Sequence, residues 1–280
     1  SYGIGLDNRA RNFFFAPWRG GTIIGTAYDV FNQPADACRL TPSDLATFVQ
    51  HVNELYPPAA LRVEDVTMTH LGVMPAKVDA KGVVKAEPSG QTRLIDYAAT
   101  DGVSGFLALL GVKYTTGSFW AERATSLILH RLGHIDGRLT GPLYGAESVA
   151  TPDTLARQAA ATGWNLSPET ARWLADSYGS RGAEVLALGA ESSAARALIP
   201  GTPVPFAAIV HAVYHEQAVH LTDVILRRTD LGSFASPASE ARRVIADIMK
   251  DLHNWSEDRR DREIADLREH YVRLGLPIES

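Results

Sequence analysis

The sequence predicts an α+β protein in which a mainly antiparallel sheet is followed by an all-α carboxy-terminal domain. Short apolar runs bounded by Gly, Pro, Asp and Ser dominate up to Lys113, whereas helical apolar spacing dominates from Thr115 onward. With 280 residues, 45% of them hydrophobic, the chain can bury one large core or two smaller ones. We therefore expect two parts, residues 1–132 and 151–280, separated by the Gly-, Leu-, Thr- and Pro-rich stretch Gly133 to Ala150.

The first part opens with a predicted hairpin and a helix. Two apolar runs in "RNFFFAPWRGGTIIGTAYDV" are joined by Arg19, Gly20 and Gly21, which is turn chemistry. In "TPSDLATFVQHVNELYP", Thr41 is a good N-cap, Pro42 suits the first helical position and Asp44 completes a capping box. Strand-like pieces follow at Val63–Val73, Gly82–Ala86, Leu94–Ala98 and Phe106–Lys113.

The second part is predicted to be a series of helices. Thr151-Pro152 and Ser167-Pro168 are each a capping residue followed by a proline, the usual start of a helix. Helical apolar spacing continues over residues 205–219, 221–231 and 238–252, and a charged helix is expected over 256–277.

Composition and short motifs exclude several classes of function. A net charge of -5, with Lys and Arg scattered among Asp and Glu, argues against nucleic-acid binding. The single cysteine, Cys38, excludes an internal disulfide framework and fits a reducing cytoplasmic setting. The apolar runs are too short to span a bilayer, which leaves only peripheral contact with the inner face of the cell membrane open.

Two motif-like patterns carry no function on their own. "GIGLDN" near the start lacks the preceding strand and the third glycine of a dinucleotide fingerprint. His211, His215 and His220 share a helical pattern, but "HEQAVH" has the wrong spacing for the zinc-protease motif. We interpret these histidines as core or surface residues and predict no metal site.

The stretch "GFLALLGVKYTTGSFWAERA" contains residues that indicate a function. An apolar strand ends at Lys113 and passes through Thr115 and Thr116 directly into a helix. A helix N-terminus carries unpaired N–H groups and partial positive charge, so an added lysine favours an anion there. The residues alone leave a second interpretation open, in which Lys113 only extends to solvent and a threonine caps the helix.

Three motifs resemble those of the FAD-dependent glycerol-3-phosphate dehydrogenase family. "FFFAPWRGGTIIGTAYD" is similar to the family's Phe-x-x-Pro-Trp-x-Gly-x-Thr-x-x-Gly-Thr-x-Asp pattern. "GVKYTT" followed by "AERA" resembles its strand-to-helix segment beside the flavin, and "HAVYHEQAVHLTDVILRRTDLG" resembles its carboxy-terminal signature. The three occur in the family's order and cover most of the chain.

The resemblance implies the carboxy-terminal portion of such an enzyme, with FAD as cofactor and glycerol 3-phosphate as substrate. The family's glycine fingerprint for the FAD diphosphate has no match here, and Ser1 stands where an initiator methionine would, so we expect a fragment of a longer protein. The general base is expected in the missing amino-terminal part, and the electron acceptor would be a quinone or oxygen. A related flavoenzyme acting on another hydroxy acid or an amine, and a non-catalytic helical interaction module, remain as alternatives.

The resemblance also implies roles for individual residues. Substrate phosphate would be bound by Lys113 and by Arg93 in "QTRLIDY". Met74 in "HLGVMPA" stands where many members of the family have an arginine. The cofactor-facing residues would be Thr26, Gly111, Val112, Lys113, Tyr114, Thr115 and Thr116.

Overall fold

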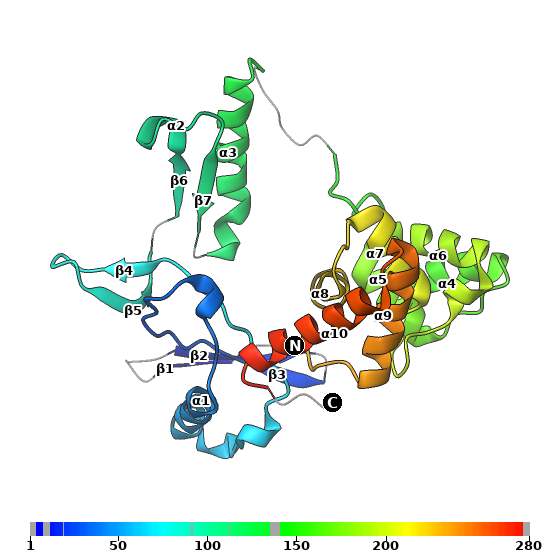
Figure 1. Cartoon of the computed structure of the whole chain (residues 1–280), viewed down its shortest axis with the longest axis horizontal. Coiled ribbons are helices and arrows are strands. Elements are labelled where there is room, and N and C mark those ends of the chain that lie inside the picture. The colour runs from blue at the N-terminus through cyan, green and yellow to red at the C-terminus, as the bar shows by residue number, and fades with distance from the viewer. Residues whose placement is uncertain are drawn as a thin grey trace. The chain divides into compact units, whose positions relative to one another are not determined.

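The chain forms two compact units in the computed structural model, which describes residues 4–7, 12–18, 20–90, 92–111, 113–134 and 141–276 (Figure 1). The first unit comprises residues 1–39, 46–61 and 71–140. The second comprises 141–280 together with two short segments from the amino-terminal half, 40–45 and 62–70. In the described residues no helix is long and apolar enough to cross a membrane.

The first unit begins with an antiparallel sheet of strand order β1-β2-β3. Its strands are β1 (Ile4–Asp7), β2 (Asn12–Trp18) and β3 (Gly21–Gly25). Gly20 has a φ of 83° at the β2–β3 turn, a backbone conformation that glycine adopts readily, and the predicted hairpin is confirmed. The predicted turn residue Arg19 lies outside the described residues.

Helix α1 (Pro42–Leu55) follows and has the predicted start. The Asp44 carboxylate accepts hydrogen bonds from the Thr41 amide at 2.8 Å and the Thr41 hydroxyl at 2.7 Å, which completes the capping box. Phe48 of α1 packs edge to face against Phe13 of β2, with ring centroids 5.4 Å apart. Phe13 is 1% exposed and anchors the small core of this unit.

The strand predicted over Val63–Val73 is wrong. Residues 57–59 and 63–65 form short 3₁₀ turns, η2 (Pro57–Ala59) and η3 (Val63–Asp65), and no strand is found between Val66 and Pro75. The Asp65 carboxylate closes the second turn by accepting from the Arg62 amide at 2.9 Å and from its guanidinium at 2.7 Å. This local pairing outweighs the strand propensity of the valines.

Two further antiparallel hairpins complete the strands of the first unit. β4 (Ala76–Val78) pairs with β5 (Val84–Pro88), and β6 (Arg93–Asp96) pairs with β7 (Leu107–Leu110). Helix α2 (Tyr97–Thr100) follows β6, capped by Asp96, and α3 (Gly117–Arg131) follows β7. The pairing is antiparallel as predicted, but within the described residues the strands form three separate small sheets.

The second unit is helical. Its first helices are α4 (Pro152–Ala161), α5 (Pro168–Tyr178) and α6 (Gly182–Glu191). Thr151 caps α4 and Ser167 caps α5, which confirms both predicted starts. α7 (Phe206–Glu216), α9 (Ser239–His253) and α10 (Glu257–Arg273) follow, and the predicted helix over 221–231 is instead the short α8 (Leu221–Asp223) and a π-helical turn, η7 (Val224–Arg228).

Apolar stripes of these helices meet in one core. Among the fully buried side chains, with none of their surface exposed, are Leu174, Val185, Ile209, Ile225, Ile245 and Leu267. One carboxylate also lies inside this core. Glu263 is 1% exposed and accepts from the Leu221 amide at 2.9 Å, so it satisfies the start of α8. The α+β class, with a helical carboxy-terminal region, is confirmed.

Candidate functional site

The predicted strand-to-helix passage is present between β7 and α3. β7 ends at Leu110, the 3₁₀ turn η4 spans Tyr114–Thr116, and α3 begins at Gly117. No threonine side chain caps the helix, because the Thr116 hydroxyl instead donates to the carbonyl of Lys113 at 3.1 Å. The threonine cap of the second interpretation is therefore wrong, whereas the exposed Lys113 agrees with that interpretation's other part, a lysine that extends to solvent.

The residues of this passage are open to solvent. Tyr114 is 101% exposed, and Gly111, Lys113 and Thr115 are also exposed. A side chain added at Gly111 would meet only Thr92, at 3.6 Å, so its backbone is accessible. Within the part of the chain that the structure describes, Lys113 makes no ion pair or side-chain hydrogen bond. Val112, also predicted here, lies outside the described residues.

Arg93 is brought to the same end of the β6–β7 hairpin. It is exposed and lies opposite Leu110 in the antiparallel register, one residue before Gly111. It too has no ion pair with another described residue. The register therefore places Arg93 at the end of the hairpin from which the chain runs through Lys113 into α3, and we call this end the open edge.

The other predicted residues, Thr26 and Met74, do not belong to the β6–β7 hairpin. Thr26 is exposed and directly follows β3, joined to Gly25 by a cis peptide bond. No hydrogen bond or ion pair among the described residues joins it to Gly111–Thr116. Met74 is 40% exposed and precedes β4. Their roles stay predictions.

An ion pair holds α3 against the hairpin. The Arg131 guanidinium, in the last turn of α3, donates to both carboxylate oxygens of Asp96 at the end of β6. Asp96 also accepts from the Ala98 amide at 3.1 Å, so one carboxylate serves α2 and α3. Because a bidentate pair restricts orientation, it helps to set the direction of α3.

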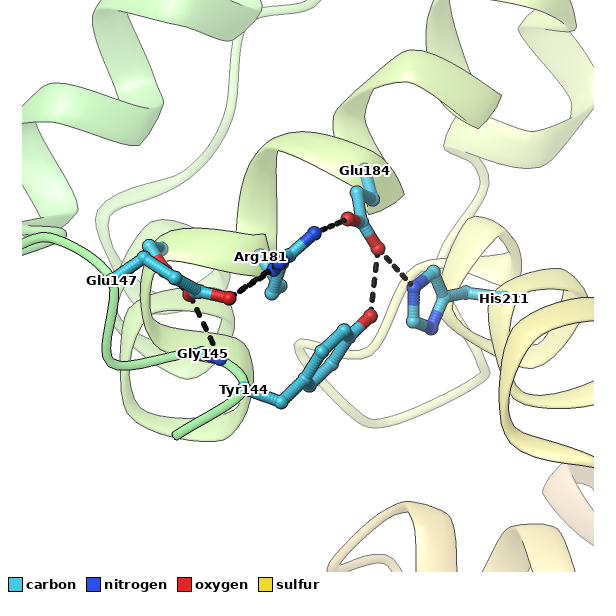
Figure 2. A network of polar contacts seen from close by, with 7 residues as sticks. Tyr144, Gly145, Glu147, Arg181, Glu184 and His211 are labelled. Atoms are coloured by element: carbon cyan, nitrogen blue, oxygen red, sulfur yellow. Dashed lines mark hydrogen bonds and ion pairs between the residues drawn. The ribbon is translucent and has the colours of Figure 1, made fainter. Parts of the chain in front are cut away.

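A second polar cluster, in the second unit, was not predicted from the sequence (Figure 2). His211 is fully buried, and its Nε2 lies 3.2 Å from Glu184. Glu184 also accepts from Tyr144 and Arg181, and Arg181 donates to Glu147. Glu184 lies 27 residues from His211 and 40 residues from Tyr144 along the chain, so local residue spacing could not predict these contacts.

Arg181 stabilises the ionised forms of both carboxylates in this cluster. Hydrogen bonds from Arg181 and Ser180 lower the pKa of Glu147 to about 2. Arg181 likewise lowers the pKa of Glu184 to about 2, with Tyr144 and His211 contributing and desolvation opposing. No group of three or more His, Cys, Asp or Glu side chains that could hold a metal ion is found in the described residues.

Comparison with known proteins finds similarity to a family model and to several named enzymes. Residues 140–260 match the family model described as the C-terminal domain of alpha-glycerophosphate oxidase. A glycerol-3-phosphate dehydrogenase of Synechocystis is 28% identical over 95% of this chain and 48% of its own length. A probable mitochondrial glycerol-3-phosphate dehydrogenase of Dictyostelium discoideum is 29% identical over 91% of this chain and 40% of its own length.

A solved structure shares the fold. It is the glycerol-3-phosphate dehydrogenase from Bacillus halodurans complexed with FAD, which matches with a TM-score of 0.72 and 19% sequence identity. The match covers 99% of this chain and 54% of the other protein's chain. The chain thus shares the fold of this α+β protein, and its residues 140–260 are similar to the C-terminal domain of alpha-glycerophosphate oxidase. The resemblance to the glycerol-3-phosphate dehydrogenase family is confirmed, and the chain spans about half the length of the relatives it matches.

Proposed function

We propose that this chain is the carboxy-terminal portion of an FAD-dependent oxidoreductase that oxidises the C2 alcohol of glycerol 3-phosphate to dihydroxyacetone phosphate. The proposal is supported by relatives named glycerol-3-phosphate dehydrogenase that cover 91 to 95% of the chain. The fold of an FAD-complexed relative supports the cofactor. We further propose a quinone or oxygen as electron acceptor, and a cytoplasmic enzyme in peripheral contact with the membrane.

The observation that carries the proposal is the open edge formed by Arg93 and Gly111–Thr116. Its exposed backbone at Gly111, its free ammonium at Lys113 and the adjacent start of α3 suit the polar, partly anionic edge of a planar ring. FAD, when bound, would supply the acceptor for the hydride removed from C2. The residues present fit that cofactor at this edge.

The roles of the chain's own residues follow from charge. Lys113 and the positive end of α3 would stabilise negative charge on a bound ring more than the neutral form, which favours hydride transfer toward it. Arg93, opposite Leu110, would bind the substrate phosphate with Lys113. We assign the proton-abstracting base to no residue of this chain.

Steady-state kinetics of the full-length protein that contains this chain would test the proposal. Arg93→Ala and Lys113→Ala should each raise the KM for glycerol 3-phosphate about tenfold or more, because each removes a charge-assisted contact worth roughly 1.5–3 kcal/mol. Lys81→Ala and Arg172→Ala, which remove exposed cations elsewhere, serve as matched controls. Turnover of glycerol 3-phosphate that neither Arg93 nor Lys113 affects would contradict the assignment.

Met74 offers a sharper test of the substrate. If the substrate is phosphorylated, Met74→Arg should leave KM unchanged or lower it, because an added guanidinium can reach a phosphate. A wild-type enzyme that prefers a non-phosphorylated polyol, with Met74→Arg shifting preference toward the phosphate ester, would instead favour the related-flavoenzyme alternative.

A further inference from the structure

Residues Tyr144–Glu147, here called the strap, lie on the helices of the second unit through polar contacts. The Glu147 carboxylate accepts from Arg181 Nε at 2.7 Å, from Arg181 Nη2, from the Ser180 hydroxyl and from the Gly145 amide at 2.9 Å. The Ser180 amide donates to the Gly145 carbonyl at 2.9 Å, a backbone link between the strap and η5 (Gly179–Arg181). Glu147 is therefore enclosed by donors.

The strap contributes almost no apolar burial. Tyr144 is 61% exposed, and no residue from 141 to 150 is fully buried. Its backbone nevertheless approaches the helices closely, because a Cβ at Gly179 would collide with the Gly145 carbonyl oxygen. Hydrogen bonds and part-exposed ion pairs contribute little net stability each, and salt screens them. The strap is thus held by the kind of contact that is easiest to break.

A single carboxylate oxygen joins the strap to the buried interior. Glu184 Oε2 accepts from the Tyr144 hydroxyl at 2.8 Å and lies 3.2 Å from His211 Nε2. Both contacts are drawn in Figure 2. The Arg181 guanidinium, which pairs with the other oxygen of Glu184, stacks over the Tyr144 ring at 4.5 Å. Tyr144 and Arg181 therefore cover the approach to Glu184 and His211.

Polar atoms that make no hydrogen bond in the described structure lie beneath this cover. His211 Nδ1, the Tyr178 hydroxyl and Glu216 Oε2 are buried and make no hydrogen bond in the described structure. His211 Nδ1 and Glu216 Oε2 are 4.0 Å apart, and the Tyr178 and His211 rings meet edge to face at 5.2 Å. Buried polar atoms are nearly always paired, so this cluster gains more from access to water than an apolar core would.

We propose that the strap is a reversible latch that opens as a unit while α5, α6 and α7 stay folded, exposing the His211 cluster to solvent. Opening breaks the contacts of Glu147 and Tyr144 but leaves the apolar core of the unit intact. A local opening of this kind needs less free energy than global unfolding. Each of these residues belongs to the second unit, so the latch rests on other contacts than the proposed site at Arg93 and Gly111–Thr116.

Hydrogen exchange of the Ser180 amide, followed by NMR on the 1–280 chain, reports latch opening directly. Glu147→Gln should raise its exchange rate roughly tenfold, because it removes the charge that binds Arg181. The exchange rate of the Ser192 amide, which donates to the Leu188 carbonyl at the end of α6, should be unchanged. The matched control is Glu257→Gln on α10, which removes the exposed partner of Lys250 on α9. It should leave the exchange rates of both amides unchanged.

Chemical modification of His211 gives a second readout. Diethyl pyrocarbonate should modify His211 faster in Tyr144→Phe and Glu147→Gln than in wild type, and faster at high salt, while His253 keeps its rate. Tyr144→Phe removes one hydroxyl, so it carries the test if Glu147→Gln does not fold. Unchanged Ser180 exchange and His211 reactivity in these variants would overturn the latch. A parallel rise at Ser192 and His253 would also overturn it, because the whole unit would then be opening.

Discussion

Two helices of equal length show how differently the two units are held. α3 and α9 each span 15 residues. α9 buries Ala241, Arg242, Ile245, Ala246 and Met249, whereas α3 has no buried residue and leaves Phe119 52% and Ile128 44% exposed. The comparison teaches that α9 is stabilised along its length by packing and α3 at its end by an ion pair. The open helix is the one that begins directly after the candidate site.

The largest expected effect comes from truncating the same residue type in each helix. Ile245→Ala in α9 should lower the free energy of unfolding of the second unit by about 2–5 kcal/mol, because the side chain is fully buried. Ile128→Ala in α3 should change stability by less than about 0.5 kcal/mol. Urea unfolding followed by circular dichroism measures both. Similar losses in the two variants would contradict the difference drawn between the helices.

A smaller effect is expected at the end of α3. Arg131→Ala removes the bidentate contact with Asp96, whose side chain is 24% exposed, and should weaken the attachment of α3 by about 0.5–1 kcal/mol. Hydrogen exchange of the α3 amides measures this. Arg123→Ala is the control, because Arg123 stacks on Phe119 and Trp120 of its own helix. Equal acceleration in both variants would show that the Asp96 contact does not hold α3.

The smallest effect appears only in acid. Because the pKa values of Glu147 and Glu184 are lowered to about 2 in the folded chain, from an ordinary 4.5, their ionised forms stabilise the strap fully above pH 4.5. This stabilisation is lost as the pH falls from 4.5 toward 2. NMR titration of the side-chain carboxyl carbons should give midpoints near 2.

A matched variant separates the contribution of Arg181 to these pKa values. In Arg181→Ala both midpoints should rise toward 4.5, while the pKa of Glu87, which is lowered by its contact with Lys77, should not move. Wild-type midpoints near 4.5 would show that the strap carboxylates are not held by Arg181.

The sequence by itself determined the helix caps and turns that residues close together in the chain form. The Thr41–Asp44 capping box, the helix starts at Thr151 and Ser167, and the turn at Gly20 were all predictable. Each is closed by hydrogen bonds or backbone preferences within a few residues, so their energy is local. The strand-to-helix passage at Lys113 was predictable for the same reason.

Only the tertiary structure decided which distant residues meet. Segment 62–70 belongs with the second unit, where the Thr69 hydroxyl donates to the Leu274 carbonyl, 205 residues away, at 2.6 Å. From the sequence, Glu263 is expected to be one of the many exposed charges on a surface helix. It is instead buried, where it accepts a hydrogen bond from the Leu221 amide, 42 residues away. The strap depends on Arg181, 34 residues from Glu147. Such contacts form only where burial of the apolar core has already fixed the chain, and residue type and spacing do not encode that position.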